Sequence, residues 1–237
     1  MKRVIPSPSL FGEYIRLKIN DYNSLTSVTD NFTGDGSTTS FTLSTYPLSM
    51  IKTVTVDGVS KEWLTDWYID WSDVTAPKIV FEEAPPDQAA ISVTYDSGTS
   101  WVRWSDVTIT ADELPMITLD VIYSRADRPP GLSFKGRSLD DTLLHSLLID
   151  VSVWVEENKS YIYEGETYWG TDLGFHMQDK ITSLLYNRTN YDYLLNRGIR
   201  FEGSFGLMRL AASPEAEQPP YISRVAKTYA FILELTI

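Results

Sequence analysis

The chain has 237 residues, of which 43% are hydrophobic and 13% aromatic, so it can bury one full core or two small ones. It contains no cysteine, which excludes disulfides, thiolate metal sites and cysteine nucleophiles. Its formal net charge of -12, with Lys and Arg scattered along the chain, argues against a protein that grips a nucleic-acid backbone.

The amino-terminal part of the sequence carries no membrane signal. No apolar run is long enough to span a bilayer, and Pro6 and Pro8 interrupt the first residues. We therefore expect neither membrane insertion nor export by a signal peptide.

The segment from Ser9 to Thr29 is ambiguous. Leu10, Tyr14 and Leu17 stand at loosely helical spacing. One interpretation is a helix that packs on a sheet formed later in the chain, which would make the following residues an insertion.

Residues 31–97 show the alternation of a small all-β unit. Val54 and Val56 alternate with polar residues, as do the apolar positions of Ile91–Tyr95. Asp57-Gly58 and Pro85-Pro86 separate such runs and are typical of turns. This pattern predicts a β-sandwich.

After residue 98 the pattern changes to longer strands and one amphipathic helix, whose apolar residues recur at helical spacing behind possible cap residues. The predicted fold class is α+β: a ββαββ sheet with a packed helix, plus the inserted sandwich. The predicted domains are an amino-terminal segment (1–30), the sandwich (31–97) and an α+β domain (98–237). The predicted elements of the last domain are strand Pro115–Tyr123, strand Ser146–Val155, helix Asp172–Tyr186, strand Arg200–Leu210 and strand Val225–Ile237.

Residues 31–95 resemble the small β modules found in tail, neck and fibre proteins of tailed phages. The resemblance begins with Asn-Phe-Thr-Gly-Asp-Gly-Ser-Thr-Thr-Ser-Phe-Thr-Leu at residues 31–43. It continues through Val54–Val59, Lys78–Phe81 and Ile91–Tyr95. Such modules occur in several parts of the virion, so the resemblance does not identify one part.

The remaining layout resembles the tail-terminator or tail-completion family of long-tailed phages. The resemblance implies a homo-oligomeric, typically hexameric ring that stops tail-tube growth and docks to the head–tail connector. It also implies a virion protein of the tail or neck that assembles in the host cytoplasm, and DNA that passes through the lumen without specific binding. The inserted module and the aromatic segment Glu156–Gly170 depart from the family, which leaves head-closure, other neck and baseplate positions open.

No pattern predicts chemistry. His145 and His176 have no partner at catalytic spacing, and His176 fits ordinary helix-surface patterning. The acids of Asp30–Gly36 do not follow calcium-loop spacing, and adjacent acidic pairs on strands point to opposite faces. We expect no catalytic residue, no cofactor and no metal, and hence a protein that is not an enzyme.

The segment Glu156–Gly170 is the candidate interface. It is interpreted as a loop, and exposed aromatic residues favour a contact with another chain. Its aromatic residues are Tyr161, Tyr163, Tyr168 and Trp169.

A receptor- or carbohydrate-binding accessory of the tail or baseplate is the alternative function. It depends on a cluster of rings in the β module that could form a sugar platform, although core packing is the commoner use of such rings. These rings are Trp63, Trp67, Tyr68 and Trp71.

Overall fold

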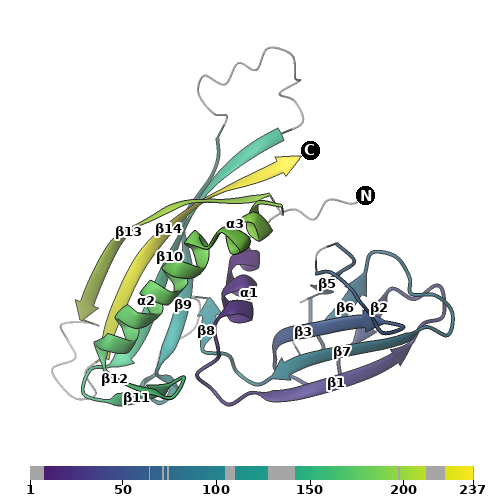
Figure 1. Cartoon of the computed structure of the whole chain (residues 1–237), viewed down its shortest axis with the longest axis horizontal. Helices are drawn as coiled ribbons and strands as arrows, with labels where there is room; N and C mark the ends of the chain where they lie inside the picture. The colour runs from purple at the N-terminus through teal and green to yellow at the C-terminus, as the bar shows by residue number, and fades with distance from the viewer. Residues whose placement is uncertain are drawn as a thin grey trace, which may run out of the picture. The chain divides into compact units, whose positions relative to one another are not determined.

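The computed structural model of the chain (Figure 1) describes residues 8–63, 65–70, 72–73, 75–104, 110–127, 142–196, 198–211 and 222–236. These residues form two compact units. Unit 2 is Asn23–Ser100, and unit 1 contains the described residues before and after it. The described chain is mostly strand with three α-helices, which confirms the predicted α+β class.

Unit 2 consists of two antiparallel sheets over one core. Residues of both sheets, among them Val54, Ile79 and Val93, belong to the same buried cluster. The four-stranded sheet has the order β1 (Thr26–Thr33), β7 (Ala90–Ser97), β3 (Leu48–Val56), β4 (Val59–Ser60). The three-stranded sheet has the order β2 (Ser40–Thr42), β6 (Lys78–Phe81), β5 (Trp67–Asp70).

Two features of unit 2 bear on the sequence analysis. Asp57 and Gly58 have φ of 51° and 76° and join β3 to β4, which confirms the predicted turn. The predicted start at residue 31, however, falls inside β1. Because β1 is a half-exposed edge strand that pairs only with β7, its first residues carry little apolar alternation for a sequence pattern to detect.

Unit 1 is built on a five-stranded sheet. All neighbours in it are antiparallel except β8 and β9. Its order is β13 (Ile199–Ala211), β14 (Ile222–Thr236), β10 (Thr142–Glu156), β9 (Met116–Asp127), β8 (Val102–Trp104). A short 3-10 helix, Ala111–Glu113, precedes β9.

Three helices lie on one face of this sheet (Figure 1). α2 (Thr171–Tyr186) confirms the predicted helix and buries Leu173, Met177 and Ile181 against β10 and β14. α1 (Pro8–Lys18) confirms the helical interpretation of the first segment, and its Phe11 ring lies 4.8 Å from the Phe231 ring. α3 (Arg188–Leu195), which the sequence analysis missed, contacts β13.

A buried glutamine shows how closely α2 fits the sheet. Gln178 has no exposed surface, and its Nε2 donates to the carbonyl oxygens of Val151 (2.7 Å) and Val225 (3.0 Å). Its Oε1 accepts a hydrogen bond from the Tyr229 hydroxyl at 3.0 Å. Because a buried amide is costly unless its groups are paired, these bonds allow Gln178 to occupy the apolar face of the helix.

Gly174 marks the closest approach of α2 to the sheet. A Cβ atom there would lie 2.6 Å from Cγ2 and 3.0 Å from Cβ of Val225, and the branched valine side chain cannot turn away from both contacts. Alanine would otherwise favour the helix by about 1 kcal/mol. The steric contact outweighs the helix propensity of alanine, so we expect alanine at position 174 to destabilise the fold.

Gly174→Ala is expected to lower the free energy of unfolding by about 1–3 kcal/mol, the usual cost of overpacking. Urea denaturation measures this change. Ser183→Ala, at an exposed position of the same helix, is the control and is expected to be neutral or slightly stabilising. Equal or greater stability of Gly174→Ala would show that the helix and sheet are not in close contact here.

Candidate interface and the aromatic cluster beneath it

The predicted aromatic loop is a two-stranded hairpin, β11 (Ser160–Tyr163) and β12 (Glu166–Trp169). Glu164 and Gly165 form its two-residue turn with φ of 53° and 85°, the combination of a type I′ turn. The sequence analysis missed it because Glu-Gly is a weaker turn signal than Asn-Gly.

The alternation of this hairpin corrects the predicted interface. Tyr161 and Tyr163 are only 1% and 3% exposed and point into unit 1, so they are not surface residues. Tyr168 is half-buried, and only Trp169, at 61% exposure, is open to solvent. The prediction treated the segment as a loop with exposed aromatic rings, whereas a strand places neighbouring side chains on opposite faces.

The outward face of the hairpin carries a residue that the prediction omitted. Ile162 is 70% exposed and pairs with Thr167, two positions from Trp169, so the two apolar side chains are diagonal neighbours. We call Ile162 and Trp169 the hairpin patch.

Beneath the hairpin lies an aromatic cluster. Its rings are mutually packed at centroid distances of 4.6–6.3 Å and come from the segment after α1, the segment before β8, the hairpin and α2. Its members are Tyr22, Trp101, Tyr161, Tyr163, Tyr168 and His176. His176 therefore packs between tyrosine rings, and Nε2 lies 3.3 Å from the Tyr168 hydroxyl.

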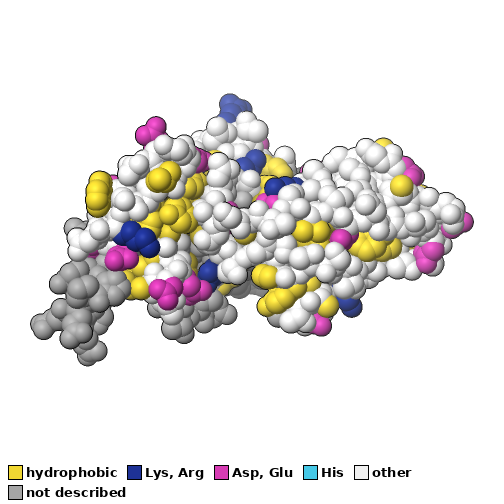
Figure 2. Space-filling view, turned by 90° about the horizontal axis from the view of Figure 1, so that it is seen from below, with side chains coloured by type: hydrophobic (Ala, Val, Ile, Leu, Met, Phe, Trp, Pro, Cys, Tyr) yellow, Lys and Arg dark blue, Asp and Glu magenta, His cyan; other side chains and the backbone are white. Residues whose placement is uncertain are grey.

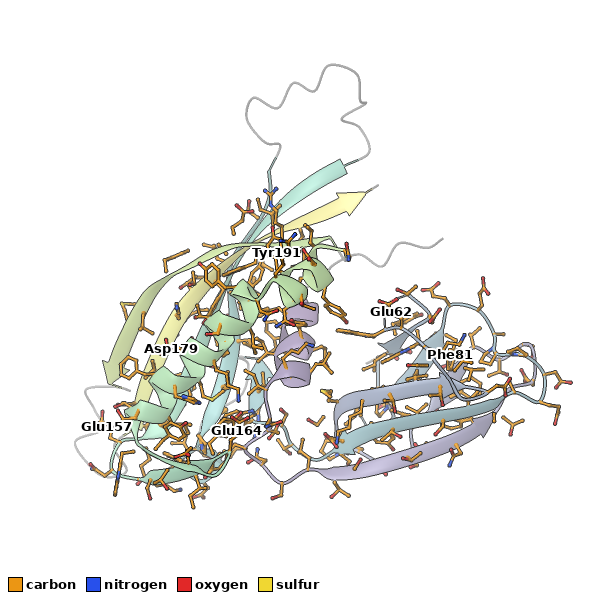
Figure 3. The ribbon with its side chains drawn as sticks, in the orientation of Figure 1. Glu62, Phe81, Glu157, Glu164, Asp179 and Tyr191 are labelled. Carbon is orange, nitrogen blue, oxygen red and sulfur yellow. The ribbon has the colours of Figure 1, made fainter. Side chains whose placement is uncertain are left out.

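Electrostatic contacts hold the tip of the hairpin. Glu164, which Figure 3 shows at that tip, accepts from Lys180 Nζ at 2.6 Å and from Asn20 Nδ2 at 2.7 Å. The Lys180 hydrogen bond lowers the pKa of Glu164, so this pair stabilises the fold above the ordinary carboxylate pKa and loses its contribution as the pH falls through the lowered value. Burial raises the pKa of the Tyr163 hydroxyl, which stays protonated.

The face of the five-stranded sheet opposite the helices has a polar part and an apolar part. In the polar part, Arg224 donates to Asp150 and Ser152 and lies over the Trp154 ring. The apolar part is exposed. Its large residues include Phe205 and Met208, each more than half exposed, and no described helix packs on this face.

The surface therefore combines apolar areas with an uneven charge. In Figure 2, hydrophobic side chains form patches on the surfaces of both units. Unit 2 carries 11 acidic and 3 basic residues, a net charge of -8 out of -12 for the chain. Most of the negative charge thus belongs to the smaller unit.

The residues that suggested chemistry take part in structural contacts or lie outside the described side chains. Among the described residues, no group of three or more His, Asp or Glu side chains could hold a metal. Asp30 accepts from the Tyr95 hydroxyl at 2.9 Å, whereas Asp35 accepts from the backbone of its own turn. The side chain of His145 lies outside the described part of the chain.

Comparison with known proteins gave no match to a protein-family model, a curated protein or a solved structure. Within the described ranges, none of the helices combines the length and apolar character needed to cross a membrane.

The two faces of the hairpin predict opposite effects of truncation. Tyr161→Ala removes a buried ring whose hydroxyl accepts from the Glu156 N–H at 2.8 Å, and it should cost about 3–5 kcal/mol. Trp169→Ala should cost less than about 1 kcal/mol, because most of that ring is already in water. Urea denaturation compares the two, and a larger loss in Trp169→Ala would contradict the assignment of the faces.

Proposed function

We propose that the chain is a structural protein of the tailed-phage neck or tail. In this proposal it is not an enzyme: it forms a hexameric ring in the virion that completes the tail tube and joins it to the head connector. The observation that carries the proposal is the pair of exposed apolar surfaces on unit 1, the hairpin patch and the open face of the sheet. Exposed apolar areas of this kind mark association surfaces in soluble proteins.

The chain order of unit 1 supports this assignment. β9 and β10 precede α2, and β13 and β14 follow it, an order that is compatible with the ββαββ layout of the tail-terminator family that the sequence resembles. The chain leaves unit 1 after Tyr22 and returns at Trp101. We propose that unit 2 is a β module inserted into this layout.

The charge of the chain agrees with a position around the DNA path. A lumen without clustered cations lets a polyanion slide, because duplex binding depends on Lys and Arg that release counterions. The net charge of -12 provides no excess of cations. DNA passes through such a ring without specific binding.

Ring assembly on tail tubes tests the proposal. We expect the double variant Ile162→Thr, Trp169→Ser to melt within about 4 °C of the wild type but to lose ring formation, because it removes mostly exposed apolar surface. Mass photometry of the free protein and of protein released from purified tail tubes counts the subunits.

The matched control for ring assembly is Tyr46→Ser, which removes an aromatic residue of 55% exposure from unit 2. This control should assemble like the wild type. A wild-type protein that remains monomeric with tail tubes present would contradict the proposal.

The alternative function, a receptor- or carbohydrate-binding tail accessory, has less structural support, because few of the described aromatic rings in the β module are exposed. Trp67 is 5% exposed in the core of unit 2 and cannot serve as a platform. Tyr68 is 38% exposed and Trp63 is half-buried, while Trp71 lies outside the described residues. Trimers at fibre tips, in place of rings at the tube end, would favour this alternative.

The proposed insertion predicts that unit 1 folds without unit 2. The two ends to be joined are close, because the backbone N–H of Trp101 donates to the Asp21 carboxylate at 3.2–3.3 Å. Replacing residues 23–100 with a short Gly/Ser linker should leave a cooperative thermal transition by circular dichroism. An insoluble or molten product would show that the two units share one folding core.

A further inference from the structure

The chain segments that lead into and out of unit 2 are held together inside unit 1. The rings of Tyr22 and Trp101, the last and first residues of unit 1 at this boundary, are stacked at 5.9 Å. The Asp21 carboxylate accepts the Trp101 N–H, as described above. The outgoing and incoming segments therefore form one anchored pair.

The hairpin β11–β12 closes over this pair. The Tyr163 ring stacks on Trp101 at 5.2 Å, and the Tyr161 ring meets Tyr22 edge-on at 6.0 Å. Both tyrosines stand on the buried face of the hairpin, so one two-stranded element covers both segments.

The tip of the hairpin is fastened by polar groups. Besides the Glu164 contacts with Lys180 and Asn20, the Tyr163 hydroxyl donates to the Asn20 carbonyl oxygen at 3.0 Å. Lys180 also lies 4.9 Å from the centre of the Tyr163 ring. These contacts connect the hairpin both to α2 and to the segment that enters unit 2.

The contacts at the hairpin tip contribute less to the free energy of unfolding than the packing of the core does. The side chains of Lys180 and Glu164 are 24% and 36% exposed, and a pair of such exposure contributes little to stability. A two-stranded hairpin is only marginally stable by itself. Within the described residues, the buried indole N–H of Trp101 also has no hydrogen-bond acceptor, which raises the free energy of the closed arrangement.

We propose that β11–β12 is a strap that holds both chain connections of unit 2 and that opens by local unfolding, without unfolding of the sheet. Loss of the fastening at its tip frees the two connections together, because Tyr161 and Tyr163 are carried by the same hairpin. β11 and β12 pair only with each other in a two-stranded sheet, and elements with such exposed backbone groups open at a lower free energy than the strands of a larger sheet. The strap is a property of the single chain and does not depend on ring formation.

Hydrogen exchange of the full chain, followed by mass spectrometry, tests the strap. Lys180→Met keeps a long helix-forming side chain but removes the ammonium group. We expect amides around residues 20–22 and 99–101 to exchange about fivefold faster, both by the same factor, as expected for loss of a partly exposed ion pair. Amides of β10 and β14 should not change.

A second variant keeps the test decisive if Lys180→Met folds poorly. Tyr163→Phe retains the stacked ring but removes the hydroxyl that donates to Asn20, and it should give the same paired acceleration. Arg188→Met is the control, because it removes a cation that is 94% exposed on α3 and should change neither segment.

Acceleration of only one segment, or of neither, would overturn the proposal. Equal acceleration in β10 and β14 would also overturn it, because the hairpin would then be part of the global core and not a separate strap.

Discussion

The pairing of β10 with β14 is the constraint on which unit 1 depends. The register runs without a shift from Thr142 opposite Thr236 to Glu156 opposite Ile222. Because side chains alternate along a strand, this register alone decides which residues face the helices and which face the other side. A slip of β10 by one residue against β14 would place Asp150 under α2 and the buried valines of β10 in water.

The two faces that this register creates have different roles. On the helix face, the fit is close at Gly174, and the buried amide of Gln178 has its groups paired. On the opposite face, Arg224 and Asp150 form an ion pair beside exposed apolar residues. A sheet with one tightly packed face and one partly exposed apolar face can fold as a single chain and keep an apolar surface in contact with solvent.

The sequence predicted the parts whose signal is local and periodic. The alternation at 147–155 and the helical spacing at 172–186 correspond to β10 and α2, because burial on one face leaves a clear period. The edge strand β1, the short helix α3 and the hairpin β11–β12 were missed or misplaced. β1 carries few apolar positions, whereas the short strands β11 and β12 carry apolar side chains on both faces, so neither segment shows the alternation that a sequence pattern detects.

The candidate interface also could not be predicted in full, because it depends on how the two strands of the hairpin pair. Composition located an aromatic segment, but only the observed hairpin register separates the buried Tyr161 and Tyr163 from the exposed Trp169 and adds Ile162. The aromatic cluster also joins residues far apart in sequence, such as Tyr22, Trp101 and Tyr163. Its packing around the connections of unit 2 could not be inferred before the fold was known.

The central claim is that the protein acts as a ring at the end of a tail tube. Electron cryo-microscopy of the purified protein mixed with isolated tail tubes tests it most directly. The account predicts a closed six-fold ring at one end of the tube, with the wall of the tube bare and the lumen open. Protein bound along the tube wall, trimers at fibre tips, or tube ends without added density would contradict it.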